Sequence, residues 1–359
     1  MKLVTHSAPH THSGNAVSNV MLHVLLALIP ATLFGIYIFG LPALNILLIT
    51  IISCLIAEAI SLRIMDKPIT PHLLDGSAVL TGLLLAMSLP PWAPWWIGVF
   101  GGFFAIIIGK QIFGGLGQNV FNPAMLARVA LLISFPLEMT TWVDIKPLFT
   151  PESPGFFESL EITFYGIPNF DAVSSASLMG YLKTELILEH SITDSLSVAN
   201  YSLSSTGMGF IAGSMGETSS ILILLGGLYL LYKRIISWHI PVTMLATIYV
   251  LAFIFNLIDS EIYVSPMYHI LSGGVMLGAF FIATDLVTSP NTKLGQIIFA
   301  IGIGVLVYVI RTWGGYPEGL GFAVLLMNAM TPLIDHYIKP RIYGRDRSGD
   351  PIEIPDKYK

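Results

Sequence analysis

A polar, glycine-rich stretch interrupts the apolar sequence at residues 110–124 and carries the amides Asn119 and Asn122. Lipid does not tolerate unpaired backbone amides, so a broken helix persists only where protein or a water-filled cavity covers it. Such breaks commonly mark ligand or ion sites. The two asparagines stand three residues apart, which predicts that both amides share one helix face and meet the edge of a heterocyclic ligand. The alternative is that Asn122 simply caps a helix starting at Pro123.

Four carboxylates lie within or at the ends of apolar segments, namely Glu58, Asp75, Glu217 and Asp285. A charged group inside a membrane is costly and is a functional-site candidate by default. Oxygen ligands of this kind suit Na⁺ or a proton relay, so these four residues are candidates for an ion path. Arg128 lies in another apolar segment and could pair with one of them. For each carboxylate, a structural ion pair or a helix cap is the competing interpretation.

A third group of candidates lies in the one long polar stretch of the chain. Asp171, Ser174, Ala176 and Ser177 belong to a run of small and hydroxyl-bearing residues beside an acid. Such a run fits a backbone turn that is open to a modifying enzyme. An ordinary serine-rich turn is the alternative.

Composition defines the elements that must position these residues. Hydrophobic residues make up 54% of the chain, charged residues only 11%, and the mean hydropathy is +0.76. A soluble domain carries about 25% charged residues, so an all-α, polytopic integral membrane protein is predicted. The single cysteine, Cys54, excludes an intrachain disulfide and a cysteine-ligated cluster. Ten apolar segments are predicted at 19–39, 42–62, 74–90, 95–113, 121–136, 219–232, 239–258, 269–285, 294–311 and 319–337.

Several of these segments are shorter than the ~20 residues of a full span. Those that start near 74, 121 and 269 fit discontinuous or tilted helices. Lys and Arg predict the orientation, because 13 of the 17 lie on one side when both termini are cytoplasmic. The predicted parts are a cytoplasmic arm (1–18), a first helical repeat (19–136), an extracytoplasmic loop (137–218), a second repeat (219–338) and a basic cytoplasmic tail (339–359).

The two halves resemble each other. Glycine and small residues at 76–86 are matched at 272–283, and a basic residue followed by paired glycines occurs at both 110–115 and 311–315. Five helices in each half give the halves opposite orientations, which is an inverted repeat. Chance similarity between glycine-rich packing surfaces is the alternative.

Several long motifs together resemble the family of D-type proteins of Rnf electron transport complexes (RnfD), which is related to the B-type protein (NqrB) of the Na⁺-translocating NADH:quinone reductase. The resemblance covers essentially the whole chain. The motifs, in chain order, are Ser7–His10, Ala27–Ala31, Asp75–Leu85, Pro90–Pro91, Gly109–Gln111, Asn122–Met125, Ser134–Pro136 and Gly213–Ser219.

The resemblance implies two flavins. One is FMN, attached through its phosphate to a hydroxyl in an outward loop, within a pattern similar to Asp-x-x-Ser-Gly-Ala-Thr that falls on residues 171–177. Ser177 is then the acceptor, and the sequence departs from the pattern by having Ser175 in place of Gly and Ser177 in place of Thr. The other is a non-covalent riboflavin near the paired asparagines Asn119 and Asn122. The implied fold is similar to that of urea and ammonium channels, with two five-helix inverted repeats.

The resemblance also implies a place in an inner-membrane translocase that couples electron flow between ferredoxin and NAD⁺ to Na⁺ or H⁺ movement. The implied partners are the membrane, iron–sulfur and flavin subunits of the complex, a flavin transferase, and membrane lipid. The sequence has no soluble NAD- or ATP-binding motif, no resident metal is predicted, and nucleic acid is not an expected partner. A passive channel or secondary transporter fits the inverted repeats and the helix breaks equally well. A structural subunit that has lost its cofactor is a third possibility.

Overall fold

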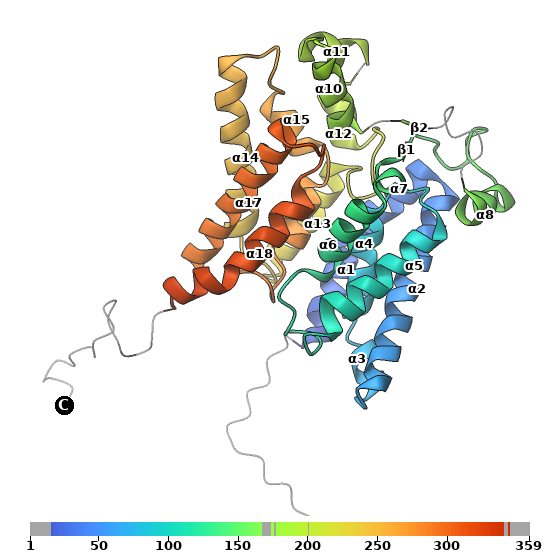
Figure 1. Cartoon of the computed structure of the whole chain (residues 1–359), viewed down its shortest axis with the longest axis vertical. Helices are drawn as coiled ribbons and strands as arrows, with labels where there is room; N and C mark the ends of the chain where they lie inside the picture. Colours follow the sequence, from blue (N-terminus) through green and yellow to red (C-terminus); the bar gives the residue numbers. More distant parts are fainter. Residues whose placement is uncertain (1–15, 167–173, 176, 200, 341–343, 345–359) are drawn as a thin grey trace, which may run out of the picture.

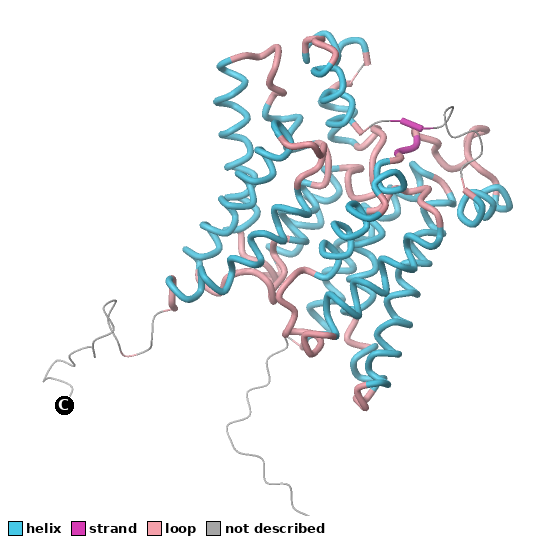
Figure 2. The backbone as a smooth tube through the Cα atoms, in the orientation of Figure 1, coloured by secondary structure: helices cyan, strands magenta, loops and turns pink. Residues whose placement is uncertain are grey.

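The structure is a computed structural model that describes residues 16–166, 174–175, 177–199, 201–340 and 344. The described chain is mostly helical, and its helices form two bundles that lie side by side (Figures 1 and 2). A small group of short helices covers one end of the bundles, while α3 and the last turn of α18 lie at the opposite end (Figure 1).

The first bundle contains α1 (Val17–Phe39), α2 (Leu41–Ile64), the short α3 (Ile69–Leu73), α4 (Ser77–Ser88), α5 (Trp95–Phe103) and α6 (Pro123–Ser134). Helix α5 continues without a break into the π-helical segment η1 (Phe104–Gln111) and ends where the polar stretch begins. Helices α4 and α6 have 12 residues each, or about 18 Å at 1.5 Å per residue. They are therefore too short to cross a bilayer as straight helices.

The second bundle contains α13 (Ser220–Tyr232), α14 (His239–Ile258), α15 (Pro266–Leu271), α16 (Val275–Leu277), η2 (Gly278–Ile282), α17 (Lys293–Trp313) and α18 (Leu320–Tyr337). The predicted segment 269–285 is interrupted between α15 and α16, as expected for a discontinuous helix. A helix occupies most of every other predicted apolar segment, with ends that differ by a few residues.

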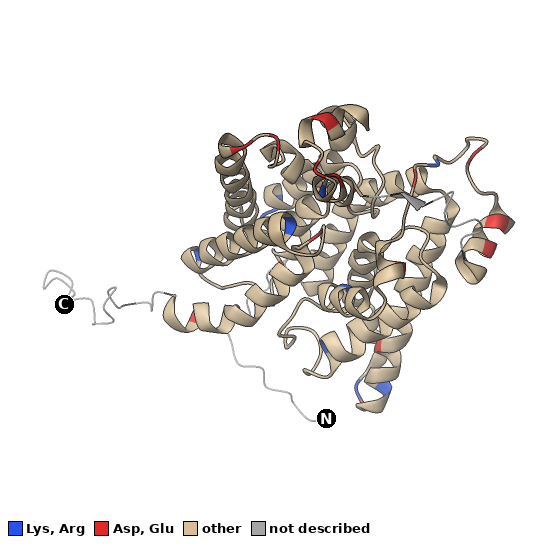
Figure 3. Ribbon diagram, turned by 45° about the horizontal axis from the view of Figure 1, so that its top comes forward, with Lys and Arg blue, Asp and Glu red and all other residues tan. Residues whose placement is uncertain are grey.

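The segment between the bundles forms α7 (Pro136–Thr140), β1 (Trp142–Val143), α8 (Phe156–Tyr165), β2 (Ser174–Ser175), α10 (Leu178–Ile187), α11 (Ile192–Val198) and α12 (Leu203–Met208). The two strands pair antiparallel, with Trp142 opposite Ser175. Acidic residues gather on this end of the molecule, whereas the helix faces of the bundles carry few charges (Figure 3).

Four of the described helices, α1, α2, α14 and α17, are long and apolar enough to cross a membrane. Many large apolar side chains on them face outward, including Leu33, Ile52, Phe253 and Ile301, each at least 42% exposed. In water this surface would be costly, but in lipid it needs no cover. With the shorter apolar helices, these features define a multi-pass membrane protein.

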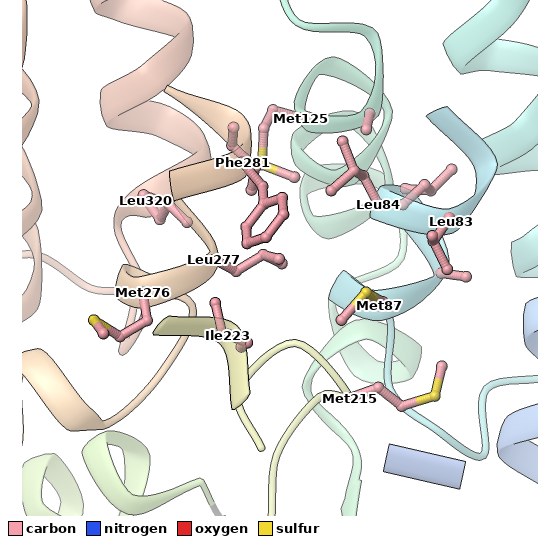
Figure 4. Close-up of a cluster of buried hydrophobic side chains, with 14 of the residues drawn as sticks. Leu83, Leu84, Met87, Met125, Met215, Ile223, Met276, Leu277, Phe281 and Leu320 are labelled. Carbon is pink, nitrogen blue, oxygen red and sulfur yellow. The ribbon is translucent and has the colours of Figure 1, made fainter. Parts of the chain in front are cut away.

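Apolar side chains fill the space where the two bundles meet. Met87 of α4, Leu277 of α16 and Phe281 of η2 point toward one another there, while the Met215 side chain is directed away from them (Figure 4). Each of the four is at most 5% exposed. The N–H of Gly216 donates to the carbonyl of Met87 at 2.6 Å, which satisfies a carbonyl at the end of α4. A Cβ on Gly216 would lie 2.6 Å from Leu277, so this close approach requires glycine.

Candidate functional site

The main candidate site is a cavity that both bundles line, here called the amide cavity. Its walls come from α1, α4, the 110–124 stretch, the end of α13 with the residues after it, and η2 with residues 284–287. The space that the centres of water molecules can occupy is about 110 Å³. The whole empty volume, including the open mouth, is about 820 Å³. Most of the lining is apolar, with a few polar groups, as is usual for ligand and cofactor sites.

Asn119 and Asn122 both line the amide cavity, but they do not share a helix face as predicted. The chain at 112–122 is irregular, because three glycines with positive φ turn it back after η1. Asn122 is the N-cap of α6, and its Oδ1 accepts from Met125 N–H at 3.2 Å. The helix-cap alternative is therefore confirmed, and the tertiary fold, not helical periodicity, brings the two amides to one cavity.

Each asparagine keeps part of its amide available. Asn119 Nδ2 donates to the carbonyl of Phe121 at 3.1 Å, and its Oδ1 has no hydrogen bond within the described chain. In the same described region Asn122 Nδ2 has none either. Both residues are at most 7% exposed. One acceptor and one donor thus remain for a ligand, which is the requirement for binding the edge of a heterocycle.

A buried charged cluster adjoins the amide cavity. Lys110, whose side chain is 3% exposed, pairs with Glu58 Oε1 at 2.5 Å and donates to Ser77 Oγ at 2.6 Å. Ser77 in turn donates to Asp75 Oδ1 at 2.5 Å, and Gln111 Nε2 donates to Glu58 Oε1 at 2.9 Å. Two of the predicted ion-path carboxylates therefore belong to one hydrogen-bonded chain with Lys110 at its centre.

A second cavity lies on the other side of this cluster and is lined by Glu58, Asp75, Gln111 and Lys67, among others. We call it the carboxylate cavity; its volume is about 340 Å³ for the centres of water-sized molecules. Glu58 Oε2 and Gln111 Oε1 are buried and have no hydrogen-bond partner among the residues that the structure describes. Buried polar atoms are normally satisfied, so such orphans call for a water, an ion or another partner.

Glu217 belongs to a separate cluster. Ser214 Oγ donates to Glu217 Oε1 at 3.0 Å, and Arg128 Nη2 lies 4.0 Å from the same oxygen. The predicted pairing of Arg128 with a membrane carboxylate is thus confirmed. Asp285 lines the amide cavity and accepts from Val287 N–H and Thr288 Oγ1, each at 3.2 Å, so it also caps a turn.

The break between α15 and α16 is held by Arg311. Its guanidinium donates to the carbonyls of His269 at 2.6 Å and Ser272 at 3.0 Å, and it binds both carboxylate oxygens of Glu318 at 2.8 and 3.0 Å. Sequence analysis did not identify Glu318, Lys110 or Gln111 as site residues. The sequence could have indicated them, because the basic residues of the matched 110–115 and 311–315 patterns need counter-charges in an apolar environment.

Ser177 is the N-cap of α10, and its Oγ accepts from Gly180 N–H at 3.3 Å. The residue is 4% exposed. A phosphoester at this oxygen would lie at the positive end of a ten-residue helix, which favours phosphate. The burial means that an enzyme can reach the hydroxyl only if the start of α10 moves or is modified before it packs. Asp171 and Ala176 lie outside the described residues, and of Ser174 only its backbone pairing with Val143 is described.

These features define a class: a multi-pass helical membrane protein with internal cavities separated by buried charged clusters. Residues 4–344 match the family described as NQR2, RnfD, RnfE, and the chain belongs to that family. The resemblance that the motifs indicated is therefore confirmed.

Several relatives, each named as the D component of an ion-translocating oxidoreductase complex, are similar over nearly their full length. The protein of Halorhodospira halophila is 52% identical over 346 residues, covering 96% of this chain and 97% of that protein. The protein of Stutzerimonas stutzeri is 54% identical over 338 residues, covering 94% and 95%. The protein of Escherichia coli strain SE11 is 42% identical over 349 residues, covering 94% and 97%.

Proposed function

We propose that this chain is the flavin-carrying membrane subunit of an ion-translocating ferredoxin:NAD⁺ oxidoreductase complex of the inner membrane. The relatives' names support the coarser part of this proposal, an ion-translocating oxidoreductase complex. The main structural support for a flavin site is the amide cavity, where Asn119 and Asn122 lie beside the Lys110–Glu58 cluster. Membrane, iron–sulfur and flavin subunits are the expected partners, and nicotinamide chemistry takes place on them.

Asn119 and Asn122 would hold a non-covalent riboflavin. The free Oδ1 of Asn119 and the free Nδ2 of Asn122 offer an acceptor and a donor for the ring edge. Apolar side chains such as Leu84, Phe280 and Phe281 also line the cavity and would pack on the ring faces. Flavins supply the one-electron chemistry, and the protein positions them and tunes their potentials. The cavity is narrow, so we expect its mouth to widen when the ring is bound.

Ser177 would carry FMN through a phosphoester. The retained serine hydroxyl supplies the required oxygen, and the start of α10 supplies N–H groups for the phosphate. Lys183 of the same helix donates its Nζ to the carbonyls of Gly314 and Tyr316 at 2.5 and 3.1 Å, which ties α10 to the chain after α17. A flavin transferase would have to act on this site before α10 packs, or after the start of α10 has moved.

Glu58, Asp75, Glu217 and Asp285 remain the proposed ion path. Glu58 and Asp75 are supported by the carboxylate cavity, where the orphaned oxygens of Glu58 and Gln111 offer the hard ligands that Na⁺ prefers. A proton carried on the same carboxylates is the alternative cargo.

The proposed topology has ten membrane segments in two inverted repeats, with both termini cytoplasmic and loop 137–218 outside. Helix packing supports the repeat: α2 packs on α4 and α5 in the first bundle, and α14 packs on η2 and α17 in the second. Equivalent helices also meet across the bundles, α1 with α13 and α6 with α18. A pseudo-two-fold axis in the membrane plane produces such pairs.

A passive channel of the same fold is the competing function. Within the described residues, Met87, Met215 and Leu277 are fully or nearly fully buried in the apolar cluster where the bundles meet (Figure 4). A continuous pore would require these side chains to move, which disfavours passive conduction.

In-gel flavin fluorescence of the denatured chain tests the covalent site. We expect fluorescence from wild type produced with its flavin transferase, retention in Ser177→Thr, and loss in Ser177→Ala. Acid extraction of the folded protein should release riboflavin, and less of it from Asn119→Leu. A wild-type chain with neither flavin would refute the redox function and favour the channel.

A further inference from the structure

Lys110 and Ser77, here called the wall, connect the linings of the two cavities by hydrogen bonds, while Leu116 lines both cavities. Both residues line the amide cavity, while their partners Glu58 and Asp75 line the carboxylate cavity. The ammonium of Lys110 contacts Glu58 Oε1 and Ser77 Oγ at 2.5 and 2.6 Å. A single buried cation therefore connects the contents of one cavity with the carboxylates of the other.

Within the hydrogen-bonded cluster at this wall, two carboxylates share one cation. Glu58 and Asp75 bring two negative charges, and Lys110 is the cation that both approach, directly or through Ser77. Glu58 is only 1% exposed, yet its Oε2 has no partner within the described chain. The arrangement leaves charge for one further cation in the carboxylate cavity, which Glu58 and Gln111 both line. Because their orphaned oxygens are buried, the cation reaches them only after a local shift of these side chains.

Two other titratable side chains, Lys67 and His72, line the carboxylate cavity. The ammonium of Lys67 donates to the carbonyl of Gly114 at 2.9 Å, in an exposed position. Among the described residues neither side chain forms an ion pair with Glu58, whose charged partner is Lys110. On the other side of the wall, Asp285 is the carboxylate that lines the amide cavity.

We propose that Lys110 couples the charge of the ligand in the amide cavity to cation binding at Glu58 in the carboxylate cavity. This inference rests on the proposed flavin in the amide cavity and adds a positioning residue that connects it to the ion path. Nothing in the geometry requires Lys110 to leave the wall, because its flexible stem needs only to change which neighbour it contacts.

The sign of the coupling follows from Coulomb attraction, which is strong at sites shielded from water. An added electron makes the amide cavity more negative and draws the Lys110 ammonium away from Glu58. The negative charge of Glu58 then lacks a nearby positive charge, and a monovalent cation that enters the carboxylate cavity neutralises it. One electron from a reduced flavin or iron–sulfur donor of a partner subunit is thus balanced by one cation, either Na⁺ bound by the Glu58 carboxylate or a proton that forms an O–H bond with it. When the ligand is oxidised again, Lys110 returns to Glu58 and the cation leaves the carboxylate cavity.

Spectroelectrochemical titration of the riboflavin in the purified complex tests this coupling. The midpoint potential is measured against Na⁺ concentration at fixed pH, with K⁺ as replacement, and against pH at fixed Na⁺. In wild type we expect the potential to rise with one of these two cations. In Lys110→Met it should be more negative, and that cation dependence should be lost. The matched control Lys233→Met removes an exposed cation that lies over the Tyr229 ring and should behave as wild type.

Two further variants separate coupling from folding. Lys110→Met leaves a buried carboxylate unpaired, which is strongly destabilising. The double variant Lys110→Met/Glu58→Gln removes both charges and should fold, bind riboflavin and show no cation dependence. Lys110→Arg keeps the charge and should retain part of the dependence. A double variant with the full wild-type cation dependence would overturn the coupling. Absence of riboflavin from the wild-type complex would instead refute the proposed function.

Discussion

Arg311 is the residue whose replacement we expect to destabilise the protein most. Its side chain is 1% exposed and makes four hydrogen bonds, two to backbone carbonyls at the break between α15 and α16 and two to Glu318. Removing one partner of a buried ion pair costs about 3–5 kcal/mol. Each carbonyl left unpaired in the interior adds about 1 kcal/mol or more. Arg311→Met should therefore cost about 5–7 kcal/mol.

Arg128→Met is the matched control. Arg128 also lies among the helices, but it is 12% exposed and its nearest carboxylate oxygen, on Glu217, is 4.0 Å away. Glu217 is itself only 2% exposed, but Ser214 still donates to it in this variant, so losing the loosely placed Arg128 should cost about 1 kcal/mol. Glu318→Gln should lie between the two, because both carbonyl bonds of Arg311 survive.

Thermal unfolding of the detergent-solubilised protein measures the difference in stability between the two variants. Unfolding is monitored by size-exclusion chromatography or by intrinsic fluorescence. For a large domain, 1 kcal/mol corresponds to about 2–4 °C. We expect Arg311→Met to lower Tm by about 10 °C or more and Arg128→Met by about 2–4 °C. Equal shifts for the two variants would show that Arg311 does not hold the break as described.

Two further predictions concern the amide cavity and the ion path. Asn122→Ala should lose riboflavin and also the N-cap of α6, which should lower the free energy of unfolding by about 1 kcal/mol. Asn122→Asp should keep the cap but lose the amide donor. Its riboflavin content should therefore fall while its Tm stays at the wild-type value. Asp75→Asn should weaken ion transport into liposomes or membrane vesicles while leaving both flavins at wild-type content; loss of flavin with intact ion transport would contradict the assignment of Asp75 to the ion path.

Sequence reasoning succeeded where the signal is local. The positions of the helices follow from runs of apolar residues, because lipid demands that every backbone group be paired within a helix. The cap at Asn122 and the start of α6 at Pro123 were also readable, because both depend on neighbouring residues only. The pairing of Asn119 and Asn122 on a helix face was wrong, because the glycines at 114, 115 and 117 adopt positive φ and break the helix before them.

The pairs that build the candidate site lie far apart in the chain. Lys110 and Glu58 are 52 residues apart, and their contact exists because η1 packs against α2. Neither residue type nor spacing shows that contact in a single sequence. For Ser177, the sequence shows the residue type and its hydroxyl. Only the structure shows that the hydroxyl oxygen caps α10 and that the residue is buried.

The sequence by itself determined the membrane class, the helical segments, the polar break at 110–124 and the family, because these depend on composition and on motifs continuous in the chain. The tertiary structure decided that the asparagines of the break face the same cavity as Lys110, and that Lys110 separates this cavity from the carboxylates of α2 and the start of α4. The physical reason is that buried charges must find counter-charges, and which one lies within reach is set by how the helices pack.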